Sequence, residues 1–149
     1  MARVELDRQG MQLLDAGECW QLLASQPVGR VGFILTGRPV ILPVNHRVDG
    51  TRIVFRTAEG SKLELATRTA GAAVAYEVDR YDADEGTGWS VLAQGTLHPV
   101  LNETEVAQLD RLELRVWPDV TDRPYWLRID VGEISGRRIL PRGDRPSEE

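Results

Sequence analysis

The chain has 149 residues, of which 42% are hydrophobic and 28% are charged, and its formal net charge is −5 at pH 7. This length and apolar content suit one domain over residues 1–149, with a packed core at about residues 15–140 and a flexible tail at 141–149. The acidic balance argues against an extended nucleic-acid surface, and no apolar run reaches the roughly 20 residues that cross a membrane.

The N-terminal segment lacks the apolar stretch of a secretory signal, so we expect a cytoplasmic protein. Cys19 is the only cysteine, and with His46 and His98 it leaves too few ligands for a Cys/His zinc site. We therefore expect no metal. Cys19 itself is expected to be a small core residue rather than a nucleophile, because no histidine lies near it in sequence.

The first half of the chain alternates helix and strand signals. Asp15 and Glu18 have the spacing of a capping box, which predicts a helix through about Ser25. Strand-like runs follow at 28–36, 40–48 and 51–57, and the last two are separated by Asp49-Gly50, a strong hairpin signal. These three runs predict an antiparallel meander.

The second half continues in the same way. A short helix is predicted at 62–68, strands at 72–79, 89–100 and 125–139, and a capped helix from Asn102 through about residue 114, with Val106, Leu109, Leu112 and Val116 at helical spacing. The pattern predicts a mainly β fold in which about six mostly antiparallel strands form a small barrel and the helices lie outside it.

The segment 56–62 contains the only lysine, Lys62, among 18 basic residues. The preceding strand would deliver Arg56 and Thr57 into a loop, and a helix would begin directly after Ser61. Two cations, two hydroxyls and helix N-terminal amides suit a phosphate group. A solvated surface loop is the alternative, because a motif of this length is a weak signal.

Motifs for other chemistries are missing. The sequence has no Gly-x-Ser-x-Gly elbow, and neither 60–62 nor 86–88 completes a phosphate loop or a dinucleotide fingerprint. If the protein is an enzyme, we expect a bound organic cofactor to supply the chemistry.

Four segments, at 42–46, 54–62, 88–95 and 134–138, resemble in order the flavin-binding split-barrel proteins related to pyridoxamine 5′-phosphate oxidase, and especially their small actinobacterial-type members. The resemblance implies a six-stranded antiparallel split β-barrel of Greek-key topology with peripheral helices. It also implies that FMN lies in a groove between two subunits, and hence that the protein is a homodimer with two sites.

The resemblance also implies roles for single residues. The FMN phosphate would be held by Arg56, Thr57, Ser61 and Lys62. The isoalloxazine ring would be lined by Val44, Asn45 and His46, and Trp89 and Ser90 would approach from the other subunit.

Two of these residues have alternatives. Trp89 is otherwise a core or interface aromatic without a ligand. His46 is a weak catalytic candidate, because nitroimidazole-reductase proteins carry a histidine on the corresponding strand, and its alternative is a polar residue that faces solvent.

The implied function is an FMN-dependent oxidoreductase or reductase that exchanges a hydride or electrons with a reduced nicotinamide or a small acceptor. Oxidation of vitamin B6 is not expected, because the chain ends soon after Arg138 without the C-terminal substrate-binding segment of that enzyme. One rival is a reductase that uses a deazaflavin of the coenzyme F420 type, which would call for more basic residues, with Arg30, Arg38 and Arg47 as candidates. The other is a non-enzymatic flavin-storage or sensor module.

Overall fold

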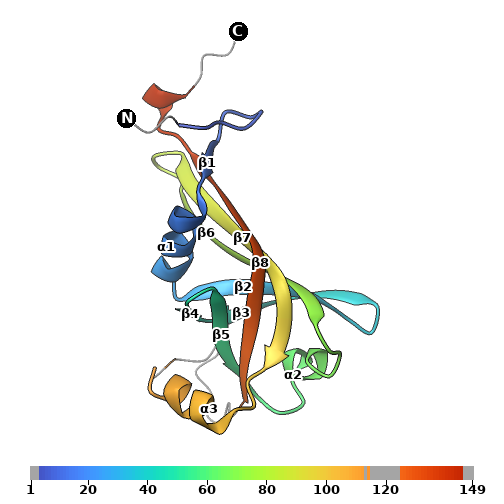
Figure 1. The fold of residues 1–149 in the computed structure, drawn as a ribbon. Coiled ribbons are helices and arrows are strands. Elements are labelled where there is room, and N and C mark those ends of the chain that lie inside the picture. Colours follow the sequence, from blue (N-terminus) through green and yellow to red (C-terminus); the bar gives the residue numbers. More distant parts are fainter. Residues whose placement is uncertain (1–3, 113, 115–124, 146–149) are drawn as a thin grey trace.

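The computed structural model describes residues 4–112, 114 and 125–145. Within these residues, one antiparallel sheet has the strand order β3-β2-β6-β7-β8-β5-β4, and β1 pairs with β8. The strands are β1 (Gln12–Leu14), β2 (Val28–Leu35), β3 (Arg38–Asn45), β4 (Arg47–Asp49), β5 (Arg52–Thr57), β6 (Ala72–Asp82), β7 (Thr87–Pro99) and β8 (Tyr125–Ile139). Figure 1 shows the sheet strongly bent, with β6, β7 and β8 as its long central strands. The mainly β fold is confirmed.

The described residues also form three α-helices, which lie around the sheet: α1 (Ala16–Ser25), α2 (Lys62–Ala66) and α3 (Glu103–Asp110). Each begins after a side chain that accepts a hydrogen bond from the backbone N–H three residues on, and these N-caps are Asp15, Ser61 and Asn102. The predicted starts are therefore confirmed. The helix predicted through residue 114 ends at Asp110 instead, and Val116 lies outside the described residues.

The strand count differs from the six predicted, because eight strands are present among the described residues. The run predicted at 40–48 is two strands, since the chain breaks pairing at His46, whose N–H donates to the Pro27 carbonyl at 3.1 Å. β1 has only three residues, too few to give an alternating pattern.

The predicted meander is confirmed in its antiparallel pairings, β2 with β3 and β4 with β5, but its middle run is divided into β3 and β4. β4 and β5 form the expected hairpin, in which Gly50 adopts a φ of 62°. β5 then pairs along its length with β8, with Thr57 opposite Tyr125 and Arg52 opposite Asp130, rather than extending the β2–β3 ladder. Sequence periodicity contains no information about which distant strand becomes the neighbour.

The main core lies on one face of the bent sheet. It joins residues of β2, β5, β6, β7 and β8 with Cys19 and Leu23 of α1, both fully buried. The prediction that Cys19 is a core residue is confirmed, and burial raises the pKa of its thiol. Gly136 of β8 makes room for it, because a Cβ at that position would lie 2.8 Å from the Cys19 sulfur.

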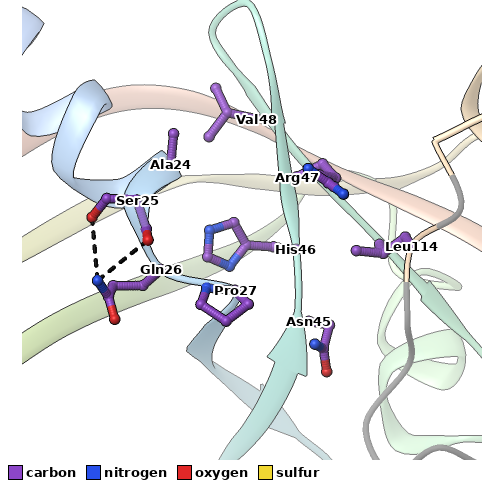
Figure 2. A pocket seen from close by; sticks show the side chains of 9 residues that line it. All are labelled: Ala24, Ser25, Gln26, Pro27, Asn45, His46, Arg47, Val48 and Leu114. Carbon is purple, nitrogen blue, oxygen red and sulfur yellow. Dashed lines mark hydrogen bonds between the residues drawn. The ribbon is translucent and has the colours of Figure 1, made fainter.

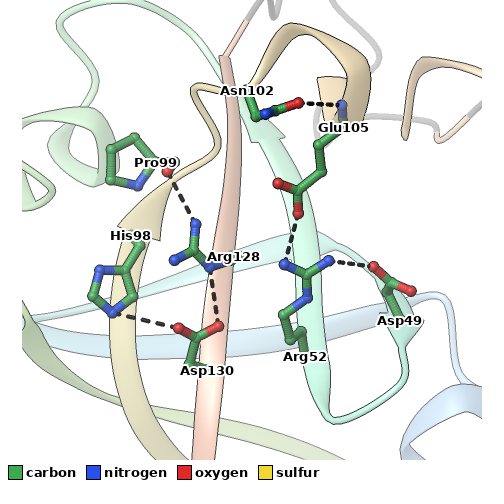
Figure 3. Close-up of polar contacts among 8 residues, drawn as sticks. All are labelled: Asp49, Arg52, His98, Pro99, Asn102, Glu105, Arg128 and Asp130. Carbon is green, nitrogen blue, oxygen red and sulfur yellow. Dashed lines mark hydrogen bonds and ion pairs between the residues drawn. The ribbon is translucent and has the colours of Figure 1, made fainter. Parts of the chain in front are cut away.

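An ion pair attaches α3 to β5, and further ion pairs lie on the neighbouring strands (Figure 3). Arg52 of β5 donates to Asp49 at 2.7 Å and to Glu105 of α3 at 2.6 Å. On the neighbouring strand, Arg128 donates to Asp130 at 3.0 Å and to the Pro99 carbonyl at 3.3 Å. Both arginines are thus committed to structural carboxylates.

The predicted tail begins with an ordered turn. Arg142–Asp144 forms one turn of 3-10 helix, and the Arg145 side chain donates to the Leu140 and Gly86 carbonyls at 2.9 and 2.7 Å. Residues 146–149 lie outside the described part of the chain. Among the described residues, no helix combines the length and the apolar character needed to cross a membrane.

Candidate functional site

The loop after β5 brings together the two hydroxyls predicted there. Thr57 is 5% exposed at the end of β5, and its Oγ1 lies 2.6 Å from the Oγ of Ser61. Ser61 also caps α2 by accepting from the Glu64 N–H at 3.0 Å. Gly60 allows the chain to turn between them with a φ of 73°. The hydroxyl pair is therefore held by the fold rather than solvated independently.

Two cations flank this hydroxyl pair along the chain. Lys62 is the first residue of α2 and is exposed, and its ammonium has no hydrogen bond or ion pair within the described residues. The Arg56 guanidinium lies over Trp126, 5.4 Å from the ring centroid. Because α2 has only five residues, its dipole adds little, and these side chains must supply most of the positive charge.

The second predicted group, Val44 to His46, enters the same end of β5. β4 pairs with β5 so that Arg47 lies opposite Val54, and β3, which ends at Asn45, also contacts β5. Val44 is buried in the core, whereas Asn45 is half-buried at the end of β3. The two predicted groups are thus neighbours in one chain.

His46 does not face solvent, so that alternative is wrong. It is 4% exposed, and its Nε2 lies 2.9 Å from the Leu23 carbonyl, which can only accept. Nε2 must therefore carry the proton, which leaves Nδ1 to accept from the Tyr76 hydroxyl. Burial lowers the pKa of His46, with a smaller lowering contribution from Arg47, while the bond to Leu23 opposes the shift.

These contacts make His46 a structural link between α1, the β3–β4 break and β6. Both of its ring nitrogens are used inside the protein, and its ring packs edge-on against Tyr76 with a centroid distance of 5.1 Å. Gly29 of β2 is needed for this arrangement, because a Cβ there would lie 2.2 Å from the Tyr76 hydroxyl. Sequence reasoning missed Tyr76 and Gly29; a glycine inside a strand was the available signal.

A pocket of about 460 Å³ opens beside this histidine, between the end of α1 and the β3–β4 break (Figure 2). Its described lining consists of Ala24, Ser25, Gln26, Pro27, Asn45, His46, Arg47, Val48 and Leu114. Asn45 and His46 were predicted site residues, whereas Gln26 and Arg47 became visible as neighbours only in the fold.

The third predicted group lies at the other end of the sheet. Trp89 pairs with Arg138 of β8, whereas Thr57 pairs with Tyr125 of the same strand. Positions 125 and 138 are 13 residues apart, which is roughly 40 Å along a strand. Trp89 is partly buried against the core and Ser90 is exposed. Within one chain, Trp89 and Ser90 therefore lie far from the other predicted site residues.

The family model for pyridoxamine 5′-phosphate oxidase matches residues 15–138. The chain belongs to this family. An uncharacterized protein of Mycobacterium tuberculosis, Rv0080, is 42% identical over 136 residues, which cover 89% of this chain and 88% of the relative.

Solved structures share the fold. The FAD binding protein of Mycobacterium smegmatis is 35% identical, with a TM-score of 0.68 over 85% of this chain and 95% of that protein. A Corynebacterium diphtheriae protein of unknown function, DIP1874, is 32% identical, with a TM-score of 0.69 over 88% and 99% of the two chains.

Proposed function

We propose that the protein binds a flavin nucleotide, FMN in the first instance, and acts as a flavin-dependent oxidoreductase. The observation that carries this proposal is the pair of hydroxyls of Thr57 and Ser61, fixed 2.6 Å apart and flanked in sequence by Arg56 and Lys62. A phosphate monoester needs several hydrogen-bond donors and positive charge, and this loop offers both.

The residues supply position and electrostatics. Lys62 and Arg56 would neutralise the phosphate, while the Thr57 and Ser61 hydroxyls would fix its direction. The half-buried Asn45, on the neighbouring strand end, would contact the ring system. A bound flavin would supply the hydride or electron chemistry, exchanging electrons with a reduced nicotinamide or a small acceptor. His46 would act by holding this strand end in place, since its ring nitrogens are already bonded inside the protein.

We further propose that the working unit is a homodimer. Trp89 and Ser90 lie roughly 40 Å along β8 from the phosphate loop of the same chain, so only a second copy could bring them to the site. The outer face of β2, β3 and β6 offers a contact surface. Gly32 and Ala75 form its floor, and Ile34 and Ile41 are 64% and 71% exposed beside a hollow of about 410 Å³.

FAD is a second candidate cofactor. A relative that is 35% identical to this chain is described as a FAD binding protein, and FAD carries a second phosphate and an adenosine that FMN lacks. The deazaflavin alternative needs several free cations, but Arg30 is paired with Asp79 at 2.9 Å and with Glu77 at 3.6 Å. Arg38 and Arg47 lie on different strands, at the start of β3 and in β4.

The test is the chromophore of the purified protein. We expect a yellow protein with a flavin spectrum, from which heat releases FMN identified by mass spectrometry. Release of FAD instead of FMN would identify FAD as the cofactor. A deazaflavin spectrum would contradict both FMN and FAD. Steady-state reduction of the bound flavin by a reduced nicotinamide, followed by transfer to an added acceptor, separates an enzyme from a storage module.

A further inference from the structure

The pocket beside His46 is positively charged, although the chain as a whole is acidic. Arg47 is the only charged side chain among its described lining residues, in a protein whose net charge is −5. Within the described residues, the Arg47 guanidinium makes no hydrogen bond or ion pair. The nearby carboxylate of Asp49 is already bonded to Arg52 at 2.7 Å. Arg47 therefore has five N–H donors available to a ligand.

The negative end of α1 also borders the pocket, but three of its last four carbonyls accept hydrogen bonds. Ser25 Oγ donates to the Leu22 carbonyl at 2.6 Å, and the His46 ring donates to the Leu23 carbonyl at 2.9 Å. Gln26 donates to the Ser25 carbonyl at 3.3 Å. Because burial lowers the pKa of His46, its ring stays neutral at neutral pH. Among the described lining residues, Arg47 alone carries a full charge.

Further donors lie at the same site. Figure 2 shows Asn45 and Arg47 on one side of the strand and the His46 ring on the other. The Asn45 side-chain amide makes no hydrogen bond within the described residues, so it remains available. The other lining residues include four apolar side chains that suit the body of a small organic molecule: Leu114 on the Arg47 side of the strand, and Ala24, Pro27 and Val48 on the His46 side.

We propose that this pocket binds the carboxylate of a small organic anion, held by Arg47 with Asn45 as a second donor. A guanidinium binds a carboxylate through two parallel N–H···O bonds, and one cation among neutral donors matches a single negative charge. About 460 Å³ accommodates a molecule of one or two rings. Asn45 belongs to the strand end that the proposed function assigns to the flavin, and on that function the anion would be the reaction partner of the flavin.

The experiment measures binding of benzoate and of its neutral analogue benzamide by saturation-transfer NMR at neutral pH, on protein with and without added FMN. The variants are Arg47→Gln and, as a matched control with the same loss of charge, Arg8→Gln, an exposed arginine of the N-terminal turn. Amide chemical shifts show whether each variant keeps the fold.

We expect benzoate to bind the parent protein and Arg8→Gln alike, and benzamide to bind at least fivefold more weakly. Arg47→Gln should weaken benzoate at least fivefold and leave benzamide unchanged. Equal binding of benzoate to Arg47→Gln, equal binding of the two probes, or no binding of benzoate would overturn the subsite. Benzoate binding without any FMN binding would contradict the proposed function while supporting the carboxylate site.

Discussion

For His46, the sequence indicated a place near the candidate site but did not predict the burial of the ring. The sequence predicted a strand through this position, whereas the structure places His46 at the break between β3 and β4, where it lines the pocket. Its burial depends on Leu23 and Tyr76, which are 23 and 30 residues away in the chain. Alternation along a strand assigns a face, but it does not reveal a distant carbonyl and hydroxyl that make burial of a polar ring favourable.

Glu77 is a second residue whose environment sequence reasoning missed. Its Oε1 is buried without a hydrogen bond within the described residues, and it shares Arg30 with Asp79. Burial, the hydrogen bond with Asp79 and the Asp79 charge raise the pKa of Glu77 to about 7, against the lowering effect of Arg30. A fully exposed carboxylate would not show this rise in pKa.

The raised pKa has a consequence for stability. Between pH 4.5 and about 7 the folded protein keeps a proton on Glu77 that the unfolded chain releases, so stability falls as the pH rises through this window. Glu77→Gln should therefore raise the melting temperature at about pH 8.5 more than at about pH 5. Thermal unfolding at both values tests this, with Glu85→Gln as the control for loss of an exposed carboxylate. An equal change at both values would contradict the assignment.

Gly29 tests the packing around Tyr76. A Cβ at Gly29 would lie 2.2 Å from the Tyr76 hydroxyl, whereas a Cβ at Gly32 in the same strand meets nothing closer than 3.9 Å. Gly29→Ala should therefore destabilise the protein by about 1–3 kcal/mol through overpacking, and Gly32→Ala by much less. Denaturant unfolding measures both. Equal losses would mean that backbone flexibility, rather than the Tyr76 contact, decides the outcome.

At the scale of elements, local signals worked best where the cause was local. The N-caps of all three described helices lie within three residues of the groups they bond, and the final strand occupies the predicted residues. The break at His46 and the pairing of β5 with β8 depend on contacts between distant segments, which periodicity does not encode. For the same reason the Ser61 cap was predictable from the sequence and the Arg47 pocket was not.

The loop from β5 to α2 gives a prediction at this scale. Ser61 caps α2 and bonds Thr57 at once, so Ser61→Ala should cost about 0.5–2 kcal/mol of stability and also weaken FMN binding. Ser61→Asp keeps the cap but adds a negative charge. It should restore much of the stability and weaken FMN further. Chemical denaturation and FMN titration separate the two effects, and recovery of both properties together would contradict a phosphate role for the loop.

At the scale of the whole molecule, the proposed shared site requires a second copy, because Trp89 lies far along β8 from the loop at Lys62 of the same chain. We expect a species of roughly twice 16.6 kDa in analytical ultracentrifugation. The double variant Ile34→Glu/Ile41→Glu places two charges on the exposed apolar face and should yield monomers that bind FMN weakly. The control Leu101→Glu changes a residue that is 79% exposed outside this face. A parent protein that is monomeric yet binds FMN tightly would contradict the shared site.

The central claim is that the loop at Lys62 recognises a phosphate, and titration of FMN and riboflavin into the parent protein and Lys62→Met tests it most directly. Removing a charge-assisted hydrogen bond of about 1.5–3 kcal/mol should weaken FMN roughly ten- to hundredfold and leave riboflavin, which lacks the phosphate, nearly unchanged. Lys62→Arg should recover part of the loss, because the charge remains but its geometry differs. Equal weakening of both ligands, or no weakening of either, would contradict the claim.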